Sequence, residues 1–139
     1  MSYQLPGDNC MERPKRVLIV EDDAHIADLL RLHLRDEGYV VEHADDGNLG
    51  VRMLEEGQWD ALVLDLMLPG VDGLEATRSI RADMNPVPIV AMTANAFVVD
   101  RHACLNAGMD DHLSKPVRPE NLYAVLMRWL ETQRRSQAA

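Results

Sequence analysis

The chain has 139 residues, with 14 Lys or Arg against 23 Asp or Glu, so its formal net charge is -9. This length suits one domain whose core needs no disulfide or metal to hold it together. The hydrophobic residues occur in blocks too short to span a membrane, and the acidic balance argues against direct binding to nucleic acid. The N-terminal sequence lacks the apolar stretch of a secretory signal, so we expect a cytoplasmic protein with no membrane attachment.

The two ends of the chain differ from its middle. Residues 1–15 carry Pro6, Gly7 and Pro14 without any hydrophobic period, which predicts a flexible N-terminal extension. We expect one folded domain over residues 16–131 and a short C-terminal tail over residues 132–139. That tail is too short to form a DNA-binding or enzymatic domain, so output would go through protein contacts. Cys10 and Cys104 share no framework and are expected to be free thiols.

Within the expected domain, short apolar blocks alternate with helical patterns. Strands are predicted at about residues 17–20, 39–44, 61–66, 89–92 and 111–113. The residues expected to begin or end the intervening helices are, in chain order, Asp23, Gly38, Gly57, Asp72 with Glu75 as a capping box, Gly108 and Pro119. Because parallel neighbours need crossovers, this alternation predicts an α/β fold with a doubly wound parallel sheet and helices on both faces.

Polar residues stand where these strands are expected to end. Glu21 and Asp22 follow the first strand, Asp65 lies at the end of the third, Thr93 follows the fourth and Lys115 follows the fifth. The carboxyl ends of parallel strands meet at one edge of the sheet, where ligands bind. The sequence therefore predicts one site that combines several carboxylates with a hydroxyl and a lysine.

Carboxylates gathered in this way repel one another, by about 4 kcal/mol for a pair about 4 Å apart near the protein surface. Either a carboxyl group keeps its proton or a divalent cation binds, and oxygen ligands favour Mg²⁺. Taken alone, residues 21–23 fit a solvated acidic turn with a helix cap equally well. The independent arrival of Asp65, Thr93 and Lys115 at the same edge favours the cation site. A phosphoryl group on Asp65 could then be bound by Lys115 and Thr93.

The chain resembles the response-regulator receiver domains of bacterial two-component signalling. The resemblance covers about residues 16–130 and rests on four segments at the strand ends: LIVEDD, LVLDLMLPGVDG, IVAMTANA and GMDDHLSKP. It implies a flavodoxin-like, five-stranded sheet with strand order 2-1-3-4-5. It also implies that Asp65 accepts a phosphoryl group from a histidine kinase or a histidine phosphotransfer protein and that a downstream protein reads the result.

The resemblance assigns a role in metal binding to four residues. Asp22 and Asp65 are implied as carboxylate ligands of Mg²⁺, the backbone carbonyl of Met67 as a third ligand, and Glu21 as a partner that acts through water. Such a domain contributes position and electrostatics, because phosphoryl transfer asks little else of a protein. It catalyses only its own phosphorylation and slow dephosphorylation, so we do not expect a classical enzyme.

The resemblance also implies a conformational switch. Thr93 is the implied switch hydroxyl, Lys115 pairs with the phosphate, and the bond from Lys115 to Pro116 is expected to be cis. His112 occupies the position where the family often has a Tyr or Phe ring that swings inward on activation. An imidazole there could respond to pH, although a surface histidine without a special role is the commoner case. The helix at 98–107, the strand at 111–113 and the closing helix would form the responding surface and a possible homodimer interface.

The residues that flank the attacking water bear on two further questions. Met67 and Asn95 occupy these positions, and the apolar Met67 predicts slow hydrolysis, with a phosphoryl lifetime of minutes or longer. Two other classes of protein fit the sequence less well. A magnesium-dependent phosphohydrolase usually has an aspartate at the position of Met67. In a flavin-binding flavodoxin, the first loop must bind phosphate, which the acidic first loop of this chain would repel.

The sequence segments are most like those of receivers attached to hybrid sensor kinases. A free-standing receiver and a part of a larger kinase therefore both stay open.

Overall fold

The fold is built on a parallel sheet. The computed structural model describes residues 14–66, 73–93 and 101–138. Its strands are β1 (Arg16–Val20), β2 (Val40–Ala44), β3 (Ala61–Asp65), β4 (Ile89–Thr93) and β5 (Asp111–Ser114). They form one parallel sheet in the order β2-β1-β3-β4-β5, which confirms the predicted strand order and the flavodoxin-like class.

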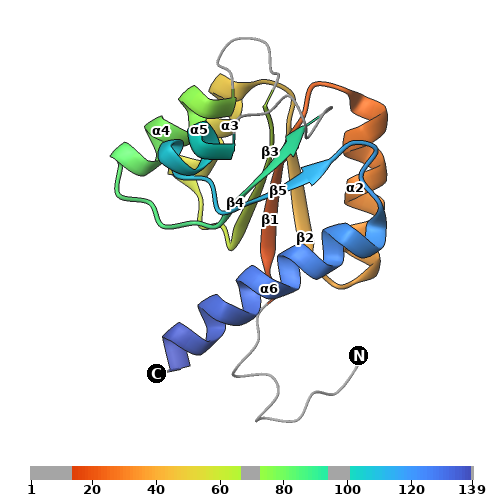
Figure 1. Cartoon of the computed structure of the whole chain (residues 1–139). Helices are drawn as coiled ribbons and strands as arrows, with labels where there is room; N and C mark the ends of the chain where they lie inside the picture. Colours follow the sequence, from red (N-terminus) through yellow and green to blue (C-terminus); the bar gives the residue numbers. More distant parts are fainter. Residues whose placement is uncertain (1–13, 67–72, 94–100, 139) are drawn as a thin grey trace.

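Helices cover both faces of this sheet. They are α2 (Ala24–Asp36), α3 (Gly47–Glu56), α4 (Gly73–Ala82), α5 (Arg101–Ala107) and α6 (Pro119–Ala138). Figure 1 shows α2 and α6 on one face and α3, α4 and α5 on the other. Each described helix therefore serves as part of a crossover or as the closing layer, as parallel pairing requires.

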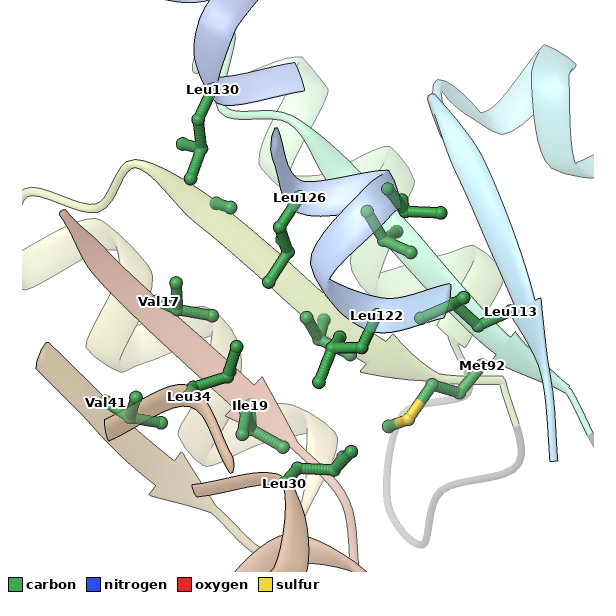
Figure 2. Packing of buried hydrophobic residues seen from close by; sticks show 14 residues of the cluster. Val17, Ile19, Leu30, Leu34, Val41, Met92, Leu113, Leu122, Leu126 and Leu130 are labelled. Carbon is green, nitrogen blue, oxygen red and sulfur yellow. The ribbon is translucent and has the colours of Figure 1, made fainter. Parts of the chain in front are cut away.

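The core lies on the two faces of the strands. Val17 and Ile19 of β1 pack toward α2 and α6, whereas Leu18 and Val20 pack toward α3 and α4. Figure 2 shows the first of these two layers, in which Leu122 and Leu126 of α6 lie over the sheet. The strands read as continuous apolar runs because both of their faces are buried.

Local signals set most of the helix ends. The Asp23 carboxylate accepts the backbone N–H groups of His25 and Ile26 at 2.9 and 3.3 Å, which confirms it as the cap of α2. Gly38, two residues after the end of α2, and Gly108, directly after α5, have φ values of 92° and 109°, in the left-handed region that favours glycine. The predicted stops at these two glycines are therefore confirmed.

The closing helix is longer than the sequence pattern indicated. The apolar stripe ends at Leu130, but α6 continues to Ala138 and includes most of the residues expected to form the tail. Residues 131–138 contain no Gly or Pro and consist mainly of residues compatible with a helix. Figure 1 shows this end of α6 extending past the sheet.

Some expectations lie outside the described residues. They concern the N-terminal extension up to residue 13, the cap at Asp72 and the start of the helix expected near residue 98. Among the residues that are described, no helix combines the length and the apolar character needed to cross a bilayer.

Candidate functional site

Three carboxylates meet at the carboxyl edge of the sheet. Glu21 and Asp22 follow β1 and Asp65 ends β3, and one oxygen from each lies within 4.8 Å of the others. Asp22 is exposed, whereas Glu21 and Asp65 are only 1% and 3% exposed. The chain thus holds two carboxylates inside the protein beside a third that faces solvent.

Backbone hydrogen bonds fix the ends of these strands. The Glu21 N–H donates to the Ala44 carbonyl at 3.0 Å and extends the pairing of β1 with β2 by one residue. His43, which the sequence pattern did not single out, places Nε2 2.7 Å from the Glu21 carbonyl oxygen. The Asp23 N–H donates to Glu21 Oε1 at 3.2 Å, so the Glu21 side chain is held at both its backbone and its carboxylate.

Lys115 supplies the positive charge of the site. Its Nζ lies 3.0 Å from Glu21 Oε2 and 3.0 Å from Asp65 Oδ2, and it donates a hydrogen bond to the latter. The Lys115 N–H donates to the Thr93 carbonyl at 2.7 Å, which ties the end of β5 to the end of β4. The Lys115–Pro116 peptide bond that follows is cis.

Thr93 lies on β4, the strand next to that of Asp65, and His112 lies on β5, one strand further out. Asp65 pairs with Met92 in the β3–β4 register, so the buried Thr93 follows directly at the same edge of the sheet. His112 lies opposite Ala91 in the β4–β5 register and is half-buried. The four segments chosen from the sequence therefore lie on adjacent strands, with Thr93 and Lys115 joined through the backbone.

Burial and mutual repulsion shape the charge of the site. Burial, the largest cause, raises the pKa of Glu21 from 4.5 to about 7; the contact with Lys115 works against this rise, and the neighbouring Asp65 adds to it. Burial lowers the pKa of Lys115, but the bonds to Glu21 and Asp65 outweigh that effect and the pKa is raised overall. Lys115 is therefore a fixed cation, whereas Glu21 sits close to its titration point near neutral pH.

The donor set fits a divalent cation. One ammonium group faces three carboxylates, and Glu21 Oε2 is fully buried without a hydrogen-bond partner despite its closeness to Lys115. Carboxylate oxygens are the ligands that Mg²⁺ prefers, and the exposed Asp22 leaves a solvent side for its water ligands. The acidic cluster could therefore bind a metal ion. Met67, the implied source of a carbonyl ligand, lies outside the described residues.

Gly73 sets how closely α4 approaches the end of β3. It begins α4, and its N–H donates to the Leu66 carbonyl at 3.0 Å. A Cβ at this position would lie 2.7 Å from Leu66 Cα and 2.9 Å from the Asp65 carbonyl oxygen. These are backbone atoms, so only glycine allows α4 to start this close to Asp65.

We expect Gly73→Ala to destabilise the protein by roughly 1 to 3 kcal/mol, because the methyl group must push the end of β3 away from α4. Urea denaturation measures this change. Ser79→Ala, on the exposed side of the same helix, is the matched control and should change stability by less than about 0.5 kcal/mol. Equal stability of the two variants would mean that the backbone of residues 65 and 66 moves away from the added methyl group without a loss of stability.

Comparison with known proteins identifies the family of the chain. Residues 17–127 match the family model of the response regulator receiver domain. The chain is 41% identical over 124 residues to the response regulator MprA of Mycobacterium bovis, covering 89% of this chain and 54% of that protein. It is 40% identical over 111 residues to the transcriptional regulatory protein TcrA of Mycobacterium tuberculosis, covering 80% and 44%. The chain thus spans about half the length of these curated relatives.

Solved structures give the same result. The receiver domain of the sensor histidine kinase PA1611 from Pseudomonas aeruginosa, solved with magnesium in its active site cleft, has 42% identity and a TM-score of 0.80, covering 86% of this chain and 99% of that one. The receiver domain of Saccharomyces cerevisiae Ssk1, solved with the histidine phosphotransfer protein Ypd1, has 32% identity and a TM-score of 0.81, covering 86% and 91%. The chain therefore belongs to the response-regulator receiver domains, the signalling domains of two-component systems.

Proposed function

We propose that this domain is a phosphoacceptor whose Asp65 takes a phosphoryl group from the phosphohistidine of a histidine kinase or a histidine phosphotransfer protein. The arrangement around Asp65 carries the proposal: a carboxylate at the end of β3, hydrogen-bonded to Lys115 and grouped with Glu21 and Asp22. The Ssk1 receiver, which is similar to this chain, was solved with such a phosphotransfer protein. A cytoplasmic location is part of the proposal.

The chemistry needs few groups. A carboxylate oxygen of Asp65 attacks the phosphorus atom, the P–N bond to the histidine breaks, and the imidazole nitrogen keeps the electron pair and takes a proton from solvent. The product is an acyl phosphate with new acceptor oxygens. Lys115, already 3.0 Å from Asp65, would pair with these oxygens, and the Thr93 hydroxyl would donate to them.

Mg²⁺ is the proposed cofactor. Asp22 and Asp65 would bind it directly with the carbonyl of Met67, and Glu21 would act through water. When bound, the ion would offset the charge of the carboxylates and of the incoming phosphoryl oxygens. The carboxylate cluster supports this assignment, as does the magnesium ion in the similar PA1611 receiver domain.

Labelling with acetyl phosphate tests the proposal. Incubated with acetyl phosphate and Mg²⁺, the protein should gain one phosphoryl group, which mass spectrometry should map to Asp65. Asp65→Asn should abolish the label. Asp46→Asn is the matched control, because Asp46 caps α3, is not part of the acidic cluster, and can be replaced by asparagine as a cap. The proposal is wrong if Asp65→Asn is labelled as well as the unmodified protein.

The output surface is proposed to be the face formed by α5, β5 and α6. Movement of Thr93 toward the phosphoryl group, followed by His112, would alter this face and so change binding to a downstream protein or to a second copy of the chain. The exposed side chains of Leu105 on α5 and Met127 on α6 offer apolar contacts for either partner.

The phosphorylated state should last for minutes or longer, because an apolar Met67 hinders the attacking water. Met67 and Asn95 both lie outside the described residues, so this prediction depends on their sequence positions alone. The measurement follows the fraction of phosphorylated protein after the donor is removed, with Mg²⁺ present. Complete loss within seconds would contradict the prediction. Met67→Asp, which places a water-binding group at this position, should shorten the lifetime.

A further inference from the structure

Asp111, the first residue of β5, joins the strand of His112 to the closing helix. Its Oδ1 accepts the His112 N–H at 2.8 Å. Its Oδ2 accepts the indole Nε1–H of Trp129 at 3.0 Å and Nη1–H of Arg128 at 2.9 Å. The Asp111 side chain is only 15% exposed, so the carboxylate is well placed to hold these donors.

The same short strand reaches the phosphoacceptor at its other end. Lys115, four residues after Asp111, contacts Asp65 through Nζ, and its N–H donates to the Thr93 carbonyl. In the sheet order of the described strands, β5 lies at one edge and pairs with β4. A displacement of Lys115 or Thr93 would act on this edge strand, whose Leu113 packs in the same core layer as α6 and whose Asp111 is hydrogen-bonded to α6.

Trp129 is placed to sense such a displacement. Its ring is half-buried and packs against the core layer between the sheet and α2 and α6. Its indole N–H depends on the Asp111 carboxylate as acceptor. If the acceptor moves, the indole loses a bond to a charged group while its ring stays in the core, so its surroundings change more than its position.

We infer that Asp111 is a positioning residue that holds β5 and α6 in the arrangement of the unmodified chain, and that phosphorylation of Asp65 weakens its bond from Trp129. The inference rests on the proposed function, since Lys115 must turn from the carboxylates toward the phosphoryl oxygens. Coupling between two sites acts in both directions. Removing the Asp111 contacts therefore favours the phosphorylated arrangement, and phosphorylation in turn alters the environment of Trp129.

Fluorescence tests the inference in the full chain. The sequence has two tryptophans, so Trp59→Phe leaves Trp129 as the sole indole. In this background, Trp129 emission should change on addition of acetyl phosphate and Mg²⁺, in step with the phosphorylated fraction measured by mass spectrometry. Adding Asp111→Ala should remove most of the emission change and speed phosphorylation by roughly fivefold, because the arrangement that phosphorylation favours is then populated more often. A merely structural role would lower thermal stability without faster phosphorylation.

Two further variants complete the test. Glu42 lies on β2, the strand at the opposite end of the sheet order from β5, and forms an ion pair with Arg16 of β1. Glu42→Ala breaks this pair and should leave both the emission change and the rate as in the parent. Trp129→Phe removes the indole donor alone and should also speed phosphorylation, which covers the case that Asp111→Ala does not fold. If Asp65 is phosphorylated while Trp129 emission and these rates stay at the parent values, the inference is overturned and the proposed function stands. If Asp65 is not labelled at all, both fall.

Discussion

Lys115→Ala is expected to lower the free energy of unfolding of the metal-free protein by about 3 kcal/mol near neutral pH, because it leaves buried carboxylates without their cation. The side chains of Glu21 and Asp65 are only 1% and 5% exposed, and Lys115 Nζ lies 3.0 Å from each. Solvent cannot replace the lost charge at such depth. Glu21 would take up a proton instead, which limits the loss.

The same substitution should slow phosphorylation by acetyl phosphate by about 100-fold, since it removes the positive charge that faces the incoming phosphoryl group. Urea denaturation and mass spectrometry measure the two effects separately. Lys15→Ala is the matched control, because Lys15 precedes β1 and so lies at the amino ends of the strands, opposite to the site. A loss of stability below about 1 kcal/mol would mean that water screens the pair despite its burial.

The sequence was sufficient to predict the sheet and the edge that carries the site. In β1, the short and mostly β-branched apolar run at residues 17–20 is typical of a strand buried on both faces, and the acids that follow it then lie at its carboxyl end. The same reasoning places Asp65 at the end of β3 and Thr93 at the end of β4. Because parallel strands end at one edge, their meeting follows from chain direction alone, and the register and carboxylate distances agree with it.

What the sequence could not predict depends on contacts between distant segments. Glu21 and Asp22 are adjacent acids, and only the turn into α2 decides that the first is buried and the second exposed. Likewise, the need for glycine at residue 73 comes from the approach of α4 to β3. Arg81 is another case: its guanidinium donates to backbone carbonyls and to Asp110, 29 residues away, which no local pattern indicates.

The metal-free protein should become less stable as the pH rises, through the titration of Glu21. In the folded state its pKa is about 7, against 4.5 for an unperturbed glutamate, so the folded protein holds a proton that the unfolded chain has already released. Stability therefore falls between about pH 4.5 and about pH 7, by on the order of 2 to 3 kcal/mol for this group alone. This direction is opposite to that of a salt-bridged carboxylate with a lowered pKa.

Glu21→Gln isolates this contribution, because glutamine keeps the size of the side chain and cannot ionise. The variant loses an acceptor for Lys115, so its stability at low pH should be somewhat lower, but the decline between about pH 5 and about pH 8 should be smaller than that of the parent by on the order of 2 kcal/mol. Urea denaturation in the presence of a chelator measures both curves, and Glu42→Gln, an exposed glutamate of β2, is the control. Parallel curves for the parent and Glu21→Gln would show that Glu21 titrates at its ordinary value. A flatter curve for the variant would mean that the ionised Glu21 lowers the stability of the folded protein. A bound cation would then stabilise the protein by relieving the repulsion among the carboxylates.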